Sequence, residues 1–114
     1  MFLLKSVADE LTRRIARIEI KTPKAIYVSN RRARALRDPD SIREDLATNI
    51  AYPVRWHDAT TVAYERGIRF FIEFPPGHTL TDLASTAFPE ARSIALSQMP
   101  IDSAVKLVKR QEDF

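Results

Sequence analysis

The chain has 114 residues, 45% of them hydrophobic and 29% charged, a balance typical of a folded globular domain. It contains no cysteine, which excludes disulfides, thiolate catalysis and zinc held by cysteine. The net charge of +3 is small for a nucleic-acid-binding arm, and no apolar run approaches the roughly 20 residues that span a bilayer. We therefore expect one cytoplasmic domain over residues 1–114, with no nucleic-acid or membrane partner.

The N-terminal part of the chain predicts a helix followed by a short strand. Apolar residues four positions apart indicate an amphipathic helix that ends near Arg17. These apolar residues are Leu3, Val7, Leu11 and Ile15. The run Ala25–Ser29 is typical of a short buried strand, and residues 31–38 read as a polar loop or turn.

A second helix opens at Asp38-Pro39. Asp38 suits the N-cap and Pro39 the first helical position, where a missing backbone N–H costs nothing. Ser41 and Glu44 form an alternative capping box one turn later. Pro53 ends this helix, because a proline removes a backbone donor and clashes with the preceding turn.

The C-terminal half predicts alternating helices and strands. The expected elements are a helix over 54–66 capped by Gly67, a strand over 68–74, a helix over 78–88, a strand over 92–96 and a helix over 102–110. The nearly continuous apolar run 68–74 favours a strand covered on both faces. We expect the last helix to turn Ile101, Val105 and Val108 inward, and the aromatic residues to lie in the core. These aromatic residues are Trp56, Phe70, Phe71 and Phe74. Strands that alternate with helices indicate an α/β fold with a mainly parallel sheet.

Few residues suggest catalysis directly. The two glycines, Gly67 and Gly77, are ten residues apart, so the chain has no Gly-x-Ser-x-Gly motif and no phosphate-binding loop. The two histidines, His57 and His78, lie at expected helix starts, where a solvated or capping role is favoured over catalysis or metal binding. No metal site is predicted. The turn over 75–78 is interpreted as a rigid connection rather than an anion site, because its two prolines supply no N–H donor.

Five motifs in order resemble the closing segment of the malonyl-CoA:acyl-carrier-protein transacylases, from Leu3 to about Leu107. The motifs are Leu4–Leu11, Val28-Ser29-Asn30, Ile42–Leu46, Asn49 with Pro53-Val54-Arg55-Trp56, and Glu73–Thr81. Within that family, Tyr64-Glu65-Arg66-Gly67 and Glu73-Phe74-Pro75-Pro76-Gly77 are most similar to the malonate decarboxylase epsilon subunit.

The resemblance implies an α/β-hydrolase-like acyltransferase domain, of which this chain is the closing part, with a short, mainly parallel sheet and flanking helices. Such enzymes move a malonyl group from coenzyme A to an acyl carrier protein through a serine ester, with a histidine as base. In the family a backbone carbonyl orients that histidine, and the matching position is Asn49. The nucleophile, the histidine and the malonyl-binding arginine correspond to positions before Met1. We therefore expect the chain alone to be inactive, with malonyl-CoA as the family's substrate and no bound cofactor.

Two functional hypotheses remain open. The chain is either part of an acyltransferase or a non-catalytic module that binds a carrier protein or a sister subunit of malonate decarboxylase. The basic stretch 30–37 is interpreted mainly as a solvated face. The alternatives are a dock, through Arg31 and Arg32, for an acidic carrier protein or for the phosphates of coenzyme A, and, less favoured, a nucleic-acid contact.

Overall fold

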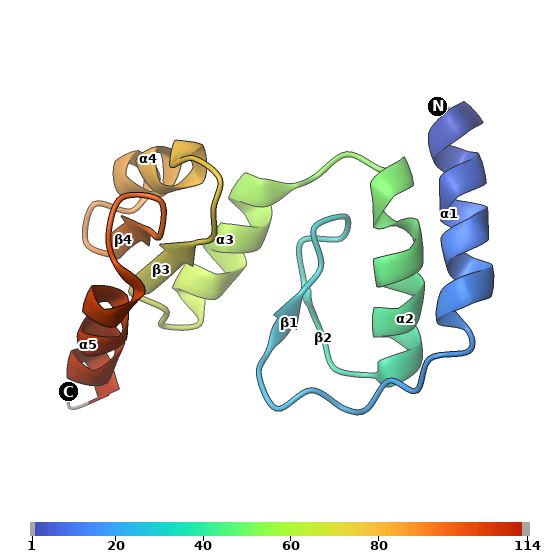
Figure 1. Ribbon diagram of the computed structural model, residues 1–114, viewed down its shortest axis with the longest axis horizontal. Coiled ribbons are helices and arrows are strands. Elements are labelled where there is room, and N and C mark those ends of the chain that lie inside the picture. Colours follow the sequence, from blue (N-terminus) through green and yellow to red (C-terminus); the bar gives the residue numbers. More distant parts are fainter. Residues whose placement is uncertain (1, 113–114) are drawn as a thin grey trace. The chain divides into compact units, whose positions relative to one another are not determined.

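The computed structural model describes residues 2–112, and the side chains of residues 4–111. Figure 1 shows helices alternating with short strands. In chain order the elements are α1 (Phe2–Ile15), β1 (Tyr27–Val28), β2 (Ala35–Leu36), α2 (Pro39–Thr48), η1 (Asn49–Ala51), α3 (Trp56–Glu65), β3 (Phe70–Glu73), α4 (Thr79–Ala87), β4 (Arg92–Ala95) and α5 (Ile101–Glu112). The chain divides into two compact units, residues 1–65 and 66–114, a division that no linker composition marks in the sequence.

The strands form two separate two-stranded sheets, so the expected mainly parallel sheet is found only in part. β3 pairs with β4 in parallel, but β1 pairs with β2 in antiparallel order. β2 itself lies in the segment expected to be a loop. The reason is the length of the connection: six residues join β1 to β2, which is enough for a hairpin but too short for a parallel crossover.

In the first unit, α2 lies between α1 and the β1–β2 hairpin (Figure 1). The predicted start of α2 is confirmed: Asp38 is the N-cap, and its carboxylate accepts a hydrogen bond from the amide of Ser41 at 2.9 Å. The alternative capping box at Ser41 and Glu44 is therefore not used. Arg43 of α2 donates to the carbonyl oxygens of Ile15, the last residue of α1, and Ile18, three residues beyond it; the Ile15 carbonyl also accepts the amide of Ile18 at 3.1 Å.

The core of the first unit is made largely of small side chains. Its buried hydrophobic residues are Ala8, Ala33, Leu36, Ile42, Ala47 and Ala59. Helical spacing places Leu46 and Ile50 on the same apolar face as Ile42, yet both are substantially exposed, as are Leu4 and Val7 of α1. Sequence spacing i,i+4 pairs Asp9 with Arg13 and Glu10 with Arg14 on α1, but in the structure both Arg13 and Arg14 bind Glu10.

In the second unit, α4 packs against one face of the β3–β4 sheet. The rings of Phe71 in β3 and Phe88 at the end of α4 stack with centroids 5.7 Å apart. The opposite face is open, contrary to the prediction of a strand covered on both faces: Ile72 is 37% exposed and Phe74 is 75% exposed. Phe74 is therefore not a core residue, whereas Phe71 is half-buried.

The last helix also differs from the prediction in the face that it buries. Ala104 is 4% exposed, but Ile101 is 67% exposed and Val105 is 46% exposed. The apolar stripe of α5 is thus only partly covered. None of the helices within residues 2–112 is long and apolar enough to cross a bilayer.

Candidate functional site

The predicted site residues meet where the β1–β2 hairpin loop lies against the end of α2. The loop is short and bonded across its base. The amide of Ser29 donates to the carbonyl of Arg34 at 2.9 Å, and the amide of Ala33 donates back to the carbonyl of Ser29 at 2.9 Å. Ala33 has a φ of 52°, a left-handed conformation that closes the loop. This closure fixes the backbone of Arg31 and Arg32.

A buried carboxylate on α2 holds this hairpin in place. Asp45 is 1% exposed, and its two oxygens accept hydrogen bonds from the hydroxyls of Ser29, at 2.6 Å, and Tyr27, at 2.5 Å. Burial, together with the hydrogen bond to Asp45 and its charge, raises the pKa of Tyr27, so this hydroxyl stays protonated and donates at neutral pH. A buried charge is tolerated when its oxygens are hydrogen-bonded in this way.

Arg31 and Arg32 point toward the C-terminal end of α2 rather than into open solvent. Arg32 pairs with Glu44 at 3.2 Å, and Arg31 lies 3.8 Å from the same carboxylate. Arg31 also donates to the hydroxyl of Thr48 at 3.2 Å, and its guanidinium carbon lies 3.5 Å from the ring centroid of Tyr52. Both arginines therefore hold the hairpin to α2, which is a structural role that the sequence analysis did not predict.

Asn49 lies at the corner where α2 gives way to η1. Its amide donates to the carbonyl of Asp45, and its own carbonyl accepts the amide of Tyr52 at 3.1 Å. A carbonyl oxygen has two lone pairs, so this one retains the capacity for a second donor. The residue is half-buried. Asn49 and Arg31 are thus brought to one corner, because Tyr52 contacts both residues.

The exposed positive charge of the hairpin lies further along the loop and β2. Arg34 and Arg37 are exposed, and neither makes an ion pair with the residues that the structure describes. Within residues 1–65 there are twelve Lys and Arg against nine Asp and Glu, whereas the remaining residues carry six of each. The basic character of the chain therefore belongs to the first unit.

The two histidines lie at the starts of α3 and α4. Beside His57, the Oδ2 of Asp58 accepts hydrogen bonds from the guanidinium of Arg55, at 3.0 and 3.1 Å. His78 is the N-cap residue of α4 and lies 2.8 Å from Asp82, with half of its side chain exposed. Among residues 2–112, no group of three His, Cys, Asp or Glu side chains is placed to hold a metal ion.

The proline–glycine turn leads to a helix whose first amides are already bonded. The carboxylate of Glu73, the last residue of β3, accepts the amides of Thr81 at 2.8 Å and Leu80 at 3.3 Å, and also the Thr81 hydroxyl. Burial opposes the charge of Glu73, but the hydroxyl and amide of Thr81, the amide of Leu80 and nearby His78 together lower the pKa of its carboxyl. These contacts favour the rigid-turn interpretation over an anion site.

The chain is 27% identical over 112 residues to the malonyl CoA-acyl carrier protein transacylase of Bacillus subtilis, a match that covers 97% of this chain and 35% of that protein. The corresponding Escherichia coli K12 protein is 27% identical over 96 residues, which cover 84% of this chain and 31% of that protein. The polyketide biosynthesis protein ThaF of Burkholderia thailandensis is 33% identical over 88 residues, 77% of this chain but 8% of that protein. No family model matches the chain.

The fold agrees with the sequence matches. The acyl-carrier-protein S-malonyltransferase of Burkholderia pseudomallei superposes with a TM-score of 0.76 at 28% identity, covering 87% of this chain and 33% of that one. This chain is similar in sequence and fold to malonyl-CoA:acyl-carrier-protein transacylases. A second structure, a type II PKS acyl-carrier protein in complex with its malonyl-transacylase, gives a TM-score of 0.75 at 27% identity and covers 83% of this chain and 31% of that one. The chain spans about a third of the length of the transacylases that it matches.

Proposed function

We propose that these 114 residues form one third of an acyltransferase that moves a malonyl group from coenzyme A to an acyl carrier protein. The supporting observation is the match to a named malonyl CoA-acyl carrier protein transacylase over 97% of this chain, together with a TM-score of 0.76 to a malonyltransferase. In this proposal the contribution of the chain to the site is the backbone carbonyl of Asn49, which has a lone pair left to accept the N–H of a catalytic histidine.

The reaction proceeds in two transfers through a serine ester. A serine oxygen attacks the thioester carbonyl of malonyl-CoA, its proton passes to the histidine, and the coenzyme A thiolate leaves with that proton. The thiol of the carrier protein then attacks the malonyl ester and releases the serine. The 114 residues contain no Gly-x-Ser-x-Gly motif, so in this proposal another part of the enzyme supplies the serine, and the resemblance to the family implies the same for the histidine.

A finer assignment, to the epsilon type of malonate decarboxylase, rests on Tyr64-Glu65-Arg66-Gly67 and Glu73-Phe74-Pro75-Pro76-Gly77. In this assignment the other subunits of malonate decarboxylase are further partners. The two segments lie at the end of α3 and in the β3–α4 connection, away from the Asn49 corner in sequence.

A split-enzyme assay tests the main proposal. The Bacillus subtilis transacylase is divided before its matched segment, and its first part is combined either with its own segment, as the positive control, or with this chain. Labelled malonyl-CoA and holo carrier protein then report transfer. We expect this chain alone to give none and the combination to restore measurable transfer. Transfer with the control segment but not with this chain would overturn the proposal.

Substitutions at Asn49 separate a backbone role from a side-chain role. Because the proposed acceptor is the main-chain carbonyl, Asn49→Ala should retain transfer in the combined enzyme to within about twofold. A loss of tenfold or more in Asn49→Ala, with unchanged assembly, would assign the function to the side-chain amide and contradict the carbonyl role.

The second candidate is a non-catalytic module that binds a carrier protein. The observation that favours it is the exposed charge of Arg34 and Arg37, which have no acidic partner among the described residues. Clustered positive charge accelerates association with an acidic protein and makes it depend on salt. We expect Arg34→Gln with Arg37→Gln to slow association of the 114-residue chain with an acidic carrier protein and to flatten its salt dependence. Identical salt slopes in the wild type and the variant would contradict this role.

The matched comparison in that assay is Arg31→Gln with Arg32→Gln, because these two arginines pair with Glu44 of α2.

A further inference from the structure

The turn that carries the Asn49 carbonyl has little support of its own. It is the three-residue 3-10 segment η1, and the hydrogen bond from the Tyr52 amide to the Asn49 carbonyl, at 3.1 Å, closes it. Such a turn has poorer hydrogen-bond geometry than an α-helix, so it fixes its carbonyls less firmly. Asn49 is half-buried and Tyr52 is 46% exposed, so the core does not hold either residue. Contacts from outside the turn therefore matter for the direction of this carbonyl.

The guanidinium of Arg31 contacts the chain on both sides of η1. Before the turn, it donates to the hydroxyl of Thr48 at 3.2 Å. After the turn, its central carbon lies 3.5 Å from the ring centroid of Tyr52. Thr48 and Tyr52 are the residues that flank η1, so Arg31 bridges the two ends of the turn.

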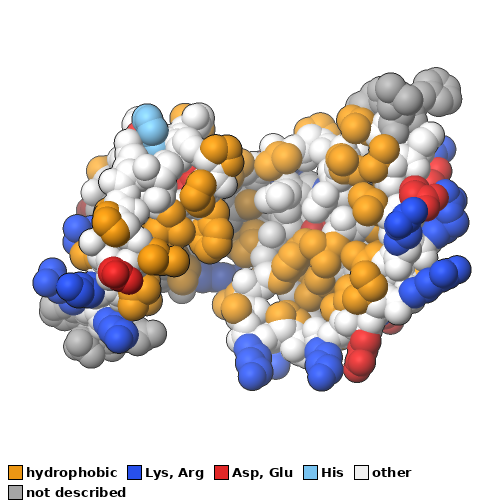
Figure 2. Space-filling model, in the orientation of Figure 1, with side chains coloured by type: hydrophobic (Ala, Val, Ile, Leu, Met, Phe, Trp, Pro, Cys, Tyr) orange, Lys and Arg blue, Asp and Glu red, His pale blue; other side chains and the backbone are white. Residues whose placement is uncertain are grey.

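This bridge depends on the chemistry of both side chains. A guanidinium is planar, so it stacks on an aromatic face while its N–H groups still reach acceptors. Lysine and arginine side chains project from the visible surface in Figure 2, whereas only 24% of the Arg31 side chain is exposed. A partly desolvated cation attracts a ring face more strongly than a cation in water does.

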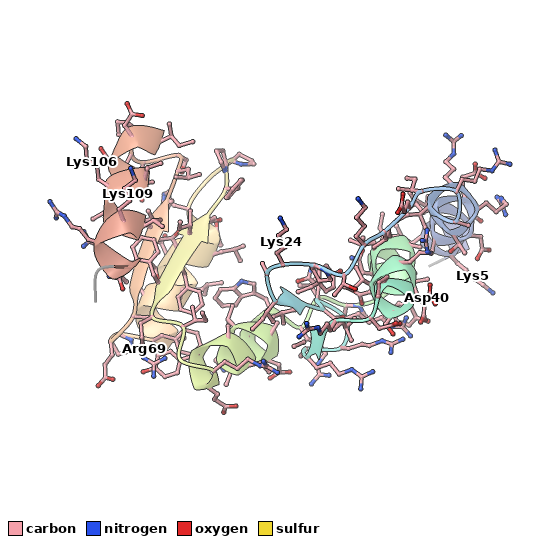
Figure 3. The ribbon with its side chains drawn as sticks, turned by 90° about the horizontal axis from the view of Figure 1, so that it is seen from below. Lys5, Lys24, Asp40, Arg69, Lys106 and Lys109 are labelled. Carbon is pink, nitrogen blue, oxygen red and sulfur yellow. The ribbon has the colours of Figure 1, made fainter. Side chains whose placement is uncertain are left out.

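The loop that carries Arg31 is itself fixed to α2. The hydroxyl of Ser29 accepts the amide of Arg32 at 3.0 Å and donates to the buried carboxylate of Asp45 at 2.6 Å. Side chains of the hairpin and of α2 lie between the two elements in Figure 3, where Asp40 labels α2. Arg31 therefore reaches η1 from a loop whose backbone is held in place.

We propose that Arg31 and Tyr52 form a positioning pair for the proposed acyl transfer. The pair holds η1 so that the remaining lone pair of the Asn49 carbonyl faces the N–H of the catalytic histidine, and neither side chain touches the reacting atoms. The inference rests on the proposed function, since it takes this carbonyl as the acceptor. Positioning of this kind matters because a misplacement of about 1 Å can lower a rate about 100-fold.

The first test is an NMR measurement on the intact 114-residue chain, without substrate. In Arg31→Gln we expect the Tyr52 amide to exchange with water about fivefold faster or more, because its bond to Asn49 opens more often. The carbonyl carbon resonance of Asn49 should shift as well. The matched control is Arg32→Gln, since Arg32 also pairs with Glu44 but takes no part in the contacts with Thr48 and Tyr52. Exchange of the Tyr52 amide should change less than about twofold in the control.

Two results of this measurement would overturn the inference. One is equal acceleration of the Tyr52 amide in Arg31→Gln and Arg32→Gln. The other is acceleration of the Ala33 amide, at the base of the hairpin loop, to the same degree as that of Tyr52. Either result would assign Arg31 to the stability of the hairpin as a whole.

The second test measures malonyl transfer by this chain combined with the first part of the Bacillus subtilis transacylase. Arg31→Gln and Tyr52→Leu should each lower kcat about tenfold and leave the KM for malonyl-CoA within about twofold, because positioning acts on the transition state. Tyr52→Phe keeps the ring face and should retain kcat within about twofold. The double variant Arg31→Gln with Tyr52→Leu should be no slower than the slower single variant, since both remove one contact.

Other kinetic patterns contradict the positioning pair. A higher KM with unchanged kcat in Arg31→Gln would place this arginine in substrate binding. Additive losses in the double variant would show that the two side chains act independently. A loss in Tyr52→Phe equal to that in Tyr52→Leu would assign the effect to the hydroxyl.

The two tests also separate this inference from the proposed function. If the wild-type chain restores no transfer while the Tyr52 amide depends on Arg31, the proposed function fails and only the contact across η1 stands. If transfer is restored and Arg31→Gln leaves kcat unchanged, the proposed function stands and the positioning role fails.

Discussion

Asp45 is the residue on which the first unit most depends. It binds the hydroxyls of Tyr27 and Ser29 through its side chain and the amide of Asn49 through its carbonyl. Asp45→Ala leaves two hydroxyls without their acceptor in a buried site. We expect the free energy of unfolding to fall by about 3 kcal/mol, measured by urea denaturation.

The matched control for Asp45 is Asp40→Ala in the same helix. Asp40 is exposed and contributes only a favourable charge near the N-terminus of α2, so its loss should cost less than about 1 kcal/mol. Equal losses for the two variants would show that the buried network contributes nothing beyond helix electrostatics.

Glu73 gives the second unit a dependence on acid. The pKa of its carboxyl is lowered from 4.5, so its contribution is complete above the unfolded value and is lost as pH falls through the lower, folded value. We expect the melting temperature of the wild type to fall more steeply than that of Glu73→Gln between about pH 5 and pH 3. Asp102→Asn, in the first turn of α5, is the control and should keep the wild-type slope. Parallel curves for wild type and Glu73→Gln would contradict the prediction.

The sequence predicts some residues of the candidate site but not the buried carboxylate that holds it together. The resemblance and the charge of the chain indicate Asn49, Arg31 and Arg32; in the structure Asn49 and Arg31 both contact Tyr52, whereas Arg32 pairs with Glu44. Asp45 was missed, although a carboxylate three residues after Ile42, on the face that should be apolar, is a signal of a buried partner. The pairing with Tyr27 and Ser29 could not be predicted, because it joins residues 16 and 18 positions apart through a hairpin that the sequence did not reveal.

At the scale of elements, motifs of a few neighbouring residues correctly predict where α2 begins and where α3 ends. Asp38 and Pro39 begin α2 as predicted, and Gly67 follows α3 with a φ of 99°. The hairpin was missed because strands of two residues have no periodicity to detect. The face of α5 was predicted incorrectly because an apolar stripe indicates only that a partner surface is favourable, and does not show which segment provides it.

Gly67 provides a test at this scale. Nothing lies within 4 Å of a Cβ built on it, so a substitution meets no steric contact and the cost comes from the left-handed backbone alone. We expect Gly67→Ala to lower the stability of the chain by about 1 kcal/mol and Gly67→Asn to cost less, since asparagine tolerates this conformation better. Thermal denaturation of the two variants measures the difference. A larger loss in Gly67→Asn than in Gly67→Ala would contradict the backbone explanation.

At the scale of the whole molecule, the two compact units should unfold separately. Each unit is small enough to have marginal stability, and the two differ in chemistry. The first holds the buried Asp45 network, and the second leaves apolar side chains of β3 and α5 exposed. We expect calorimetry to resolve two transitions. Asp45→Ala should lower only one of them, and Glu73→Gln should lower only the other. A single transition shifted by both variants would show that the units fold as one.

The closed hairpin loop also has a consequence for how the chain tolerates changes of length. Residues 30–33 are enclosed by the two backbone bonds between Ser29, Ala33 and Arg34, and the serine is bound to Asp45. An inserted residue there would break one of these backbone bonds and move Arg31 and Arg32 of the loop away from Glu44 of α2. Residues 19–26, between α1 and β1, form no helix or strand. Insertions and deletions among natural variants should therefore gather in residues 19–26 and avoid the hairpin loop.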